Sequence, residues 1–265
     1  MDINNLFSVK GKVAVVTGGS RGIGEMITSG FLANGAKVYI SARKAPALIE
    51  KAEELSIRYD MECIAIPCDL STKDGINDLV SQISSKENGI DFLINNAGAA
   101  WGEPFENFSE AGWDKVMDLN VKSLFFLTQA MKSLLISNAS LEDPSRVVNI
   151  GSIDGLNVPA LPTFSYSASK AAVHHLTRVL AGQLVSENIL VNAIAPGPYP
   201  SNMLGAAVNH DYSEIENRNP RKRVGTPEDI AGLTIFLCSR AGSYTVGETI
   251  TSDGGIVKTA SHNLS

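Results

Sequence analysis

The stretch "VAVVTGGSRGIG", residues 13–24, decides the fold of this chain. Five residues suited to a buried strand run into a glycine-rich turn, and a helical pattern opens near Gly22. A strand, a glycine-rich turn and a helix in that order are typical of the first unit of a dinucleotide-binding fold. The helix N-terminus would offer unpaired N–H groups and a positive dipole end to a phosphate. Glycines also make plain turns, and the position after the first strand is what favours binding. We expect nucleotide contacts from Gly18, Ser20, Arg21, Gly22, Ile23 and Gly24.

Outward from this unit, short apolar runs alternate with longer helical patterns. The runs are apolar on both faces, as strands covered on both sides must be. Alternating elements with short connections predict one α/β domain over residues 1–265, a doubly wound, Rossmann-type parallel sheet of about seven strands with helices on both faces. The further strands are expected at 37–41, 62–68, 91–95, 146–151, 190–195 and 248–253, and the helices at about 45–58, 72–86, 113–138, 164–187 and 227–239.

Composition excludes several classes of protein. The 265 residues are 44% hydrophobic and 19% charged, which suits a globular domain. A net charge of −6 argues against a nucleic-acid surface. Three cysteines at unpaired spacings predict reduced thiols and no metal site. No signal pattern or membrane-length apolar run is evident, so we expect a soluble cytoplasmic protein without a membrane partner.

The end of the second strand indicates which dinucleotide is bound. NAD-binding sites usually place an acid there for the ribose hydroxyls, whereas this chain has Arg43. Together with Arg21, Arg43 could flank a 2′-phosphate, which favours NADP(H). The alternative is a solvated arginine at the start of a helix. Asp69 and Leu70 follow the third strand and are expected near the adenine, although Asp69 could instead belong to a helix cap. Asn96, Ala97 and Gly98 follow the fourth strand and are expected near the adenine ribose.

Four residues predict the chemistry: Asn120, Ser152, Tyr166 and Lys170. Tyr166 and Lys170 are spaced i, i+4 on a predicted helix, so both side chains share one face. A lysine ammonium beside a phenol favours the phenolate and lowers its pKa. Ser152 ends an apolar strand, where its hydroxyl could bind the substrate oxygen that the tyrosine protonates. A lone Tyr-x-x-x-Lys pair on a helix usually lies on the surface without a catalytic role. The four residues together, in a chain with a nucleotide loop, predict proton transfer to a carbonyl oxygen.

These motifs resemble the short-chain dehydrogenase/reductase family. The resemblance runs from Lys12 to about Gly255, over "TGGSRGIG", "CDL", "NNAG", Asn120 of "DLN", "NIGS", "YSASK", "APG" and "SDGG". "SARK", "APGPYPSNM" and two longer loops resemble a subgroup of NADPH-dependent 3-oxoacyl reductases associated with rhamnolipid biosynthesis. The interval from Ser152 to Tyr166 is one residue longer than the commonest family form, which we expect to alter specificity.

The resemblance implies a role for each matching residue. It implies that Tyr166 is the catalytic acid/base, that Lys170 lowers the tyrosine pKa and binds the nicotinamide ribose, and that Ser152 binds the substrate oxygen. Asn120 would hold a water beside the lysine. The remaining positions implied beside the nicotinamide are Pro196, Gly197 and Ser201, the last where the family commonly has threonine.

The expected activity is reduction of a 3-oxoacyl thioester, carried on acyl carrier protein or CoA, by NADPH. A sugar, polyol or other secondary-alcohol dehydrogenase is the alternative, and a non-catalytic nucleotide-binding sensor is a remote one. The long segment 197–226 is expected to be a substrate-binding loop or lid. The resemblance also implies a homo-oligomer, a tetramer or dimer, formed through the helices near 113–138 and 164–187.

Overall fold

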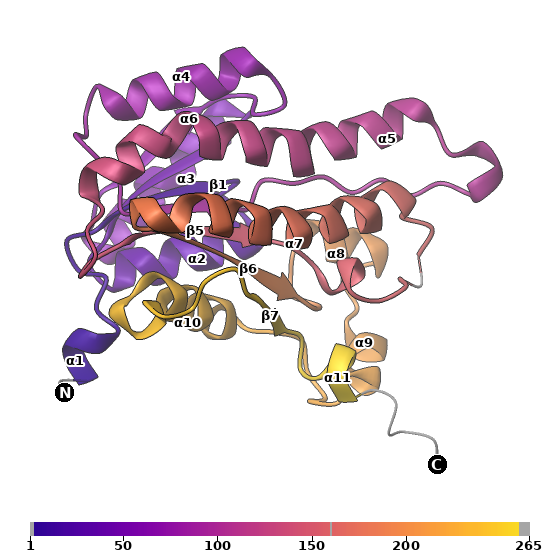
Figure 1. Cartoon of the computed structure of the whole chain (residues 1–265). Helices are drawn as coiled ribbons and strands as arrows, with labels where there is room; N and C mark the ends of the chain where they lie inside the picture. The colour runs from indigo at the N-terminus through magenta and orange to yellow at the C-terminus, as the bar shows by residue number, and fades with distance from the viewer. Residues whose placement is uncertain (1–2, 160, 260–265) are drawn as a thin grey trace.

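A seven-stranded parallel sheet forms the centre of the computed structural model, which describes residues 3–159 and 161–259 (Figure 1). The strand order is β3-β2-β1-β4-β5-β6-β7. This confirms the predicted single-domain, doubly wound α/β fold. The predicted domain spans residues 1–265, of which 1–2, 160 and 260–265 lie outside the described residues. The strands are β1 (Val13–Thr17), β2 (Lys37–Ala42), β3 (Cys63–Pro67), β4 (Phe92–Asn95), β5 (Ser145–Ile150), β6 (Ile189–Pro196) and β7 (Thr249–Ser252).

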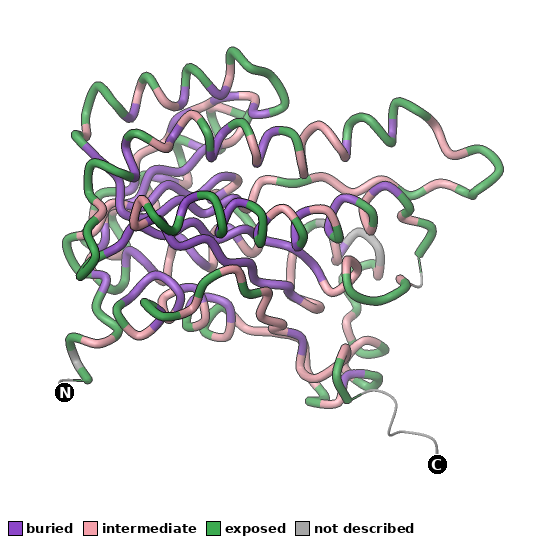
Figure 2. The backbone as a smooth tube through the Cα atoms, in the orientation of Figure 1, coloured by how far each residue is buried: buried purple, intermediate pink, exposed green. Residues whose placement is uncertain are grey.

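Helices cover both faces of the sheet and bury two separate apolar layers (Figure 2). Alternate strand residues point to opposite faces, so Ala14 and Val16 join one layer and Val15 joins the other. The first layer packs under α2 (Gly22–Ala33), α3 (Ala45–Tyr59) and α10 (Pro227–Cys238). The second packs under α4 (Lys73–Ser84), α6 (Ser123–Asn138) and α7 (Phe164–Leu184).

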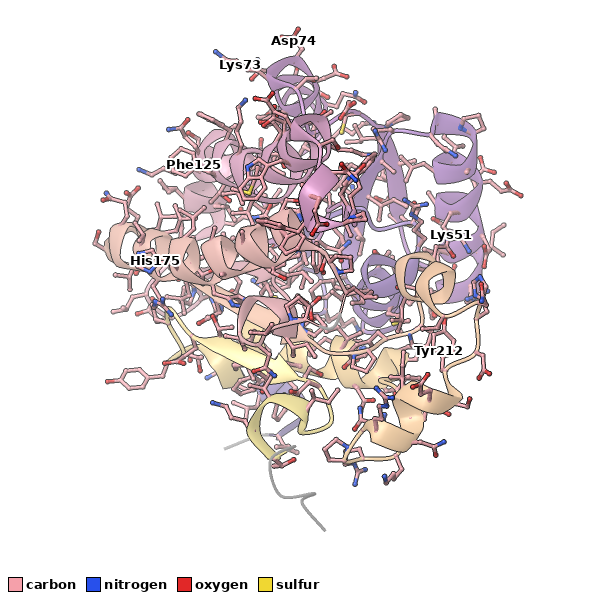
Figure 3. All side chains as sticks on the ribbon, turned by 90° about the vertical axis from the view of Figure 1, so that its right-hand side faces the viewer. Lys51, Lys73, Asp74, Phe125, His175 and Tyr212 are labelled. Atoms are coloured by element: carbon pink, nitrogen blue, oxygen red, sulfur yellow. The ribbon has the colours of Figure 1, made fainter. Side chains whose placement is uncertain are left out.

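The strand order reverses between β1 and β4, because β3 lies at one edge of the sheet and the chain then crosses back to β4. In open α/β sheets, ligands bind at such a switch point, outside the carboxyl ends of the strands. Figure 3 looks onto the side where these ends lie, with Lys51 and Tyr212 to one side and Phe125 and His175 to the other.

The largest difference from the predicted elements lies in the long helix expected at about 113–138. Two helices occupy this region, α5 (Glu110–Met117) and α6, joined by a π-helical turn over Asp118–Lys122. The Ser109 hydroxyl caps α5 by accepting from the Gly112 N–H, which explains the earlier start. No proline or glycine marks the interruption in the sequence. Such turns are rare and often occur at functional sites.

The segment 197–226 is more ordered than the irregular stretch predicted there. It contains two short helices, α8 (Asn202–Ala207) and α9 (Ser213–Arg218). The two ends of the segment are joined because the Gly225 N–H donates to the Pro198 carbonyl at 2.9 Å. Tyr199 is buried and shares a hydrogen bond with the Ser252 hydroxyl at 2.5 Å. The base of the segment is therefore fixed to the end of β7. The short helices α1 (Ile3–Leu6) and α11 (Ile256–Thr259) are the remaining α-helices among the described residues.

Candidate active site

The glycine loop has the shape that close approach of a nucleotide requires. Gly18 and Gly22 adopt φ of +65° and +54°, a region that favours glycine. A Cβ on Gly24 would lie 2.2 Å from the Gly18 carbonyl oxygen, so only glycine fits there. The helix α2 begins at Gly22, and its N-cap residue Arg21 makes no side-chain capping hydrogen bond. The first N–H groups of α2 therefore have no side-chain cap, which suits a phosphate-binding terminus.

The segment after β4 is fastened to this loop through Thr17. The Thr17 hydroxyl accepts from the N–H groups of Asn96 and Ala97, both at 2.9 Å, and donates to the Ile94 carbonyl. The Asn96 amide donates to the Thr17 carbonyl at 2.8 Å. The residues predicted to line the adenine ribose thus border the glycine loop. Sequence reasoning missed Thr17, although it is the strand residue directly before Gly18.

Two arginines and one aspartate are predicted to contact the adenine half of the dinucleotide. Arg21 and Arg43 are exposed, and neither makes an ion pair among the described residues. Asp69 is half-buried; its carboxylate accepts from the Ser71 hydroxyl and N–H, which holds the pKa of Asp69 below its usual range, and Arg43 contributes to the lowering. The cap of α4 is Thr72, so Asp69 does not cap that helix itself. Leu70 is buried beside it.

Asn120 sits in the π-helical turn and is almost completely buried. Its amide donates to the Ala99 carbonyl and to the Ser169 hydroxyl, both at 2.9 Å, and its oxygen accepts from the Ala99 N–H at 2.8 Å. The Ser169 hydroxyl donates onward to the Tyr166 carbonyl at 2.7 Å. Asn120 therefore ties the chain after β4 to the helix that carries the predicted tyrosine. Ser169 was missed, although it lies within the "YSASK" motif.

Ser152, Tyr166 and Lys170 come together at the carboxyl end of β5. The Ser152 hydroxyl lies close enough to the Tyr166 phenol to act on the pKa of that phenol. The Lys170 ammonium donates to the Ile150 carbonyl at 2.8 Å and lies 5.5 Å from the centre of the Tyr166 ring. A Cβ on Gly98 would lie 3.8 Å from Lys170 Nζ and 3.2 Å from Asn120 Oδ1. The four predicted catalytic residues thus form one group beside the glycine loop.

The electrostatics of this group differ from the expected lowering of the tyrosine pKa. Burial raises the pKa of Tyr166 to about 12, although the nearby Ser152 hydroxyl acts in the opposite direction. Burial also lowers the pKa of Lys170 to about 8. The Lys170 ammonium donates its hydrogen bond to the Ile150 carbonyl and not to the phenol. The loss of water around the phenol therefore raises the pKa of Tyr166 by more than the nearby cation lowers it.

The residues predicted beside the nicotinamide lie at the end of β6. Pro196 is the last residue of that strand, and the Gly197 N–H donates to the Ser252 carbonyl at 3.0 Å. A Cβ on Gly197 would collide with Asp253 at 2.8 Å. Ser201 caps α8 by accepting from the Leu204 N–H. A Cβ added to Gly22 would come within 3.2 Å of the Ser201 Cβ. The segment after β6 therefore approaches the glycine loop.

Among the residues described, no group of three or more His, Cys, Asp or Glu side chains is arranged to hold a metal ion. Cys63, Cys68 and Cys238 are free and buried. None of the helices in residues 3–159 and 161–259 combines the length and apolar character needed to cross a bilayer.

Comparison with known proteins agrees with this fold. A family model described as enoyl-(acyl carrier protein) reductase matches residues 18–257. A rhamnolipids biosynthesis 3-oxoacyl-[acyl-carrier-protein] reductase from Pseudomonas aeruginosa is 45% identical, over 94% of this chain and 97% of the relative. A 2-dehydro-3-deoxy-D-gluconate 5-dehydrogenase from Escherichia coli is 37% identical, over 96% of this chain and 98% of the relative. The solved RhlG/NADP active-site complex of Pseudomonas aeruginosa superposes with a TM-score of 0.91 at 44% identity, covering 96% of this chain and 99% of the other.

A doubly wound sheet with a glycine loop after its first strand and a Ser–Tyr–Lys group at the carboxyl end of β5 defines a nucleotide-dependent oxidoreductase. The chain belongs to the short-chain dehydrogenase/reductase family.

Proposed function

We propose that this protein uses NADPH to reduce a 3-oxoacyl thioester, carried on acyl carrier protein or CoA, to the 3-hydroxyacyl thioester. The observation that carries the proposal is the grouping of Ser152, Tyr166 and Lys170 beside a glycine loop at one end of the sheet. The 45% identity with a 3-oxoacyl-[acyl-carrier-protein] reductase over nearly the whole chain supports the choice of substrate class.

The residues of the site divide the work of proton transfer. The Ser152 hydroxyl donates a hydrogen bond to the substrate carbonyl oxygen, and the Tyr166 phenol protonates that oxygen. The raised pKa of Tyr166 keeps the phenol protonated at neutral pH, as a proton donor requires. Lys170 and Asn120 border the same space and restore the proton after each turnover. NADPH, when bound, supplies the hydride.

The choice of NADPH rests on charge. Arg21 and Arg43 are exposed and without ion pairs among the described residues, and arginine matches phosphate geometry better than other side chains. The NADP complex of the structural relative supports the same choice. On the adenine side we assign Gly18, Ser20, Gly22, Ile23, Gly24, Asp69, Leu70, Asn96, Ala97 and Gly98, and on the nicotinamide side Pro196, Gly197, Ser201, Tyr166 and Lys170.

The first test measures oxidation of NADPH and NADH with acetoacetyl-CoA and longer 3-oxoacyl thioesters, in the wild type and in Tyr166→Phe. We expect turnover with NADPH and a fall in kcat of roughly a hundredfold or more in the variant, because the phenolic proton donor is lost. The control is NADPH binding, which should be unchanged. Tight NADPH binding without turnover by the wild type would reject the acyl substrate.

Two other functions remain in competition. A sugar-acid dehydrogenase is favoured by the 37% identity with the gluconate-type enzyme of Escherichia coli, and a panel of keto sugars and polyols tests it. A nucleotide-binding sensor would gain support if Tyr166→Phe abolished reduction without affecting the biological role of the protein.

We further propose that residues 197–226 form the substrate lid, that the chain assembles as a dimer or tetramer, and that it acts in the cytoplasm. Exposed apolar side chains on the helices α5, α6 and α7 support the assembly, among them Trp113, Phe126 and Val179. Light scattering of the purified protein tests it. The free, buried cysteines are consistent with a reducing compartment.

A further inference from the structure

Asp154 carries a carboxylate close to Ser152, and the proposed proton transfer does not involve this carboxylate. It lies in the 3₁₀ turn Ile153–Gly155, two residues after Ser152, and its N–H donates to the Ser152 hydroxyl at 3.2 Å. The turn is pressed against α7: a Cβ on Gly155 would come within 2.6 Å of the backbone of Lys170 and Ala171. Asp154 is therefore held where Ser152 and α7 meet.

The charge of Asp154 acts on the reacting group. Burial raises the pKa of Asp154, while the Lys170 ammonium acts in the opposite direction. In turn the carboxylate contributes to raising the pKa of Tyr166, and it counters the lowering at Lys170. No described residue donates a hydrogen bond to the carboxylate oxygens, and the neighbouring ammonium is already bound to the Ile150 carbonyl. The half-buried carboxylate therefore keeps its oxygens without a hydrogen-bond donor among the described residues.

We propose that Asp154 determines specificity by admitting neutral 3-oxo esters and thioesters and rejecting substrates with a carboxylate close to the reacting carbonyl. The inference rests on the proposed carbonyl reduction at Ser152 and Tyr166. Like charges a few ångströms apart in a partly buried site repel strongly, because little water screens them. A thioester has no charge beside its 3-oxo group, whereas a free 3-oxo acid does.

A pair of substrates isolates this effect. Acetoacetate and ethyl acetoacetate carry the same reacting ketone and differ in charge at the neighbouring carboxyl. We expect Asp154→Asn to raise the ratio of kcat/KM for acetoacetate over ethyl acetoacetate by about tenfold or more. Asp154→Glu keeps the charge and should leave the ratio unchanged. Glu53→Gln removes one negative charge from the exposed face of α3 and serves as the matched control.

An unchanged ratio in folded Asp154→Asn, or an equal loss for both compounds, would overturn the proposal and leave Asp154 a positioning role only. Asp154→Ser provides a second charge-free variant if the asparagine variant fails to fold. The proposed function fails if the wild type also leaves acetoacetyl-CoA unreduced. If the wild type reduces neither test compound, the same variants are compared by titrating both compounds against the fluorescence of bound NADPH. Tighter binding of acetoacetate alone in Asp154→Asn would then support the specificity role, and equal binding would contradict it.

Discussion

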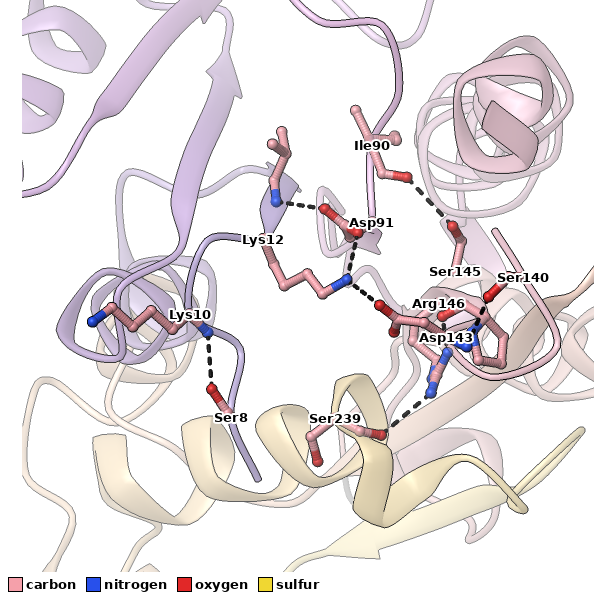
Figure 4. A network of polar contacts seen from close by, with 12 residues as sticks. Ser8, Lys10, Lys12, Ile90, Asp91, Ser140, Asp143, Ser145, Arg146 and Ser239 are labelled. Atoms are coloured by element: carbon pink, nitrogen blue, oxygen red, sulfur yellow. Dashed lines mark hydrogen bonds and ion pairs between the residues drawn. The ribbon is translucent and has the colours of Figure 1, made fainter. Parts of the chain in front are cut away.

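The polar groups differ between the amino edge of the sheet, where the parallel strands begin, and the carboxyl edge, where they end. At the amino edge, the Lys12 ammonium lies 2.9 Å from Asp91 Oδ1 and 2.6 Å from Asp143 Oδ2, and the second Asp91 oxygen accepts from the Val13 N–H at 2.8 Å (Figure 4). Nearby, buried Arg146 donates to the carbonyls of Pro144 and Ser239. The charged groups at the amino edge are therefore paired or hydrogen-bonded within the protein.

At the carboxyl edge, the corresponding groups are left available. Arg21 and Arg43 have no ion-pair partner among the described residues, and the N-terminus of α2 lacks a side-chain cap. The Asp154 carboxylate acts on the Tyr166 phenol through its charge, and no described residue donates a hydrogen bond to that carboxylate. The comparison teaches that the amino edge stabilises the fold, while the carboxyl edge keeps its polar groups for ligands.

The largest effect on stability should come from Asp91→Ala at the amino edge. The change leaves the Val13 N–H without its acceptor and Lys12 without its more buried partner, so we expect a loss of about 3 kcal/mol in the free energy of unfolding. Urea denaturation measures this loss, and activity per folded molecule should be unchanged.

Two variants serve as controls for Asp91→Ala. Asp143→Ala removes the half-exposed partner of Lys12 and should cost less than about 1 kcal/mol. Tyr166→Phe at the opposite edge should change stability by no more than about 0.5 kcal/mol while it removes activity. If Asp91→Ala lost activity but not stability, the division between the two edges would be wrong.

The next effect in size concerns His174, which lies beside Ser152. Its Nε2 accepts from the Ser152 N–H at 3.4 Å, and its Nδ1 has no partner among the described residues. Burial, with the positive charges of Lys170 and Arg178, lowers the pKa of His174 from 6.5 to about 4. The unfolded chain therefore binds a proton at a higher pH than the folded chain does, and folding is favoured most above pH 6.5.

As the pH falls from about 6.5 to about 4, the wild type should lose about 2–3 kcal/mol of stability through this one group. Denaturation at a series of pH values measures the slope. His174→Asn should flatten it, whereas His175→Asn, which alters the exposed neighbour, should leave it intact. An equal slope in the wild type and His174→Asn would exclude His174 as the source.

Much of the fold could be predicted because its signals are local. All seven strands lie within two residues of the expected positions, since each except β7 is a largely apolar run between polar turns. Gly18, Gly22 and Gly24 could be assigned to the loop because their spacing reflects backbone shape. The "YSASK" spacing likewise placed Tyr166 and Lys170 on one helix.

Other features depend on contacts that the sequence does not display. The π-helical turn at Asp118–Lys122 contains no proline or glycine that would have indicated it. Asn120 within this turn is held by Ala99 and Ser169, which are distant in the sequence. The pKa of Tyr166 was expected to fall because Lys170 lies one turn away. It rises because the packing around the phenol removes water and the ammonium turns to the Ile150 carbonyl, and neither fact is visible in the spacing.

The smallest predicted effect concerns Arg43 at the exposed rim of the carboxyl edge. If this guanidinium binds the 2′-phosphate, Arg43→Ala should lower kcat/KM for NADPH by about tenfold, or about 1.5 kcal/mol, because one charge-assisted contact is lost. The value for NADH should stay the same, since NADH lacks that phosphate. Arg58→Ala, which removes an exposed arginine paired with Glu54 on α3, is the matched control. Equal losses with both cofactors would mean that Arg43 shapes the loop without reading the phosphate, and the preference would then have to come from Arg21.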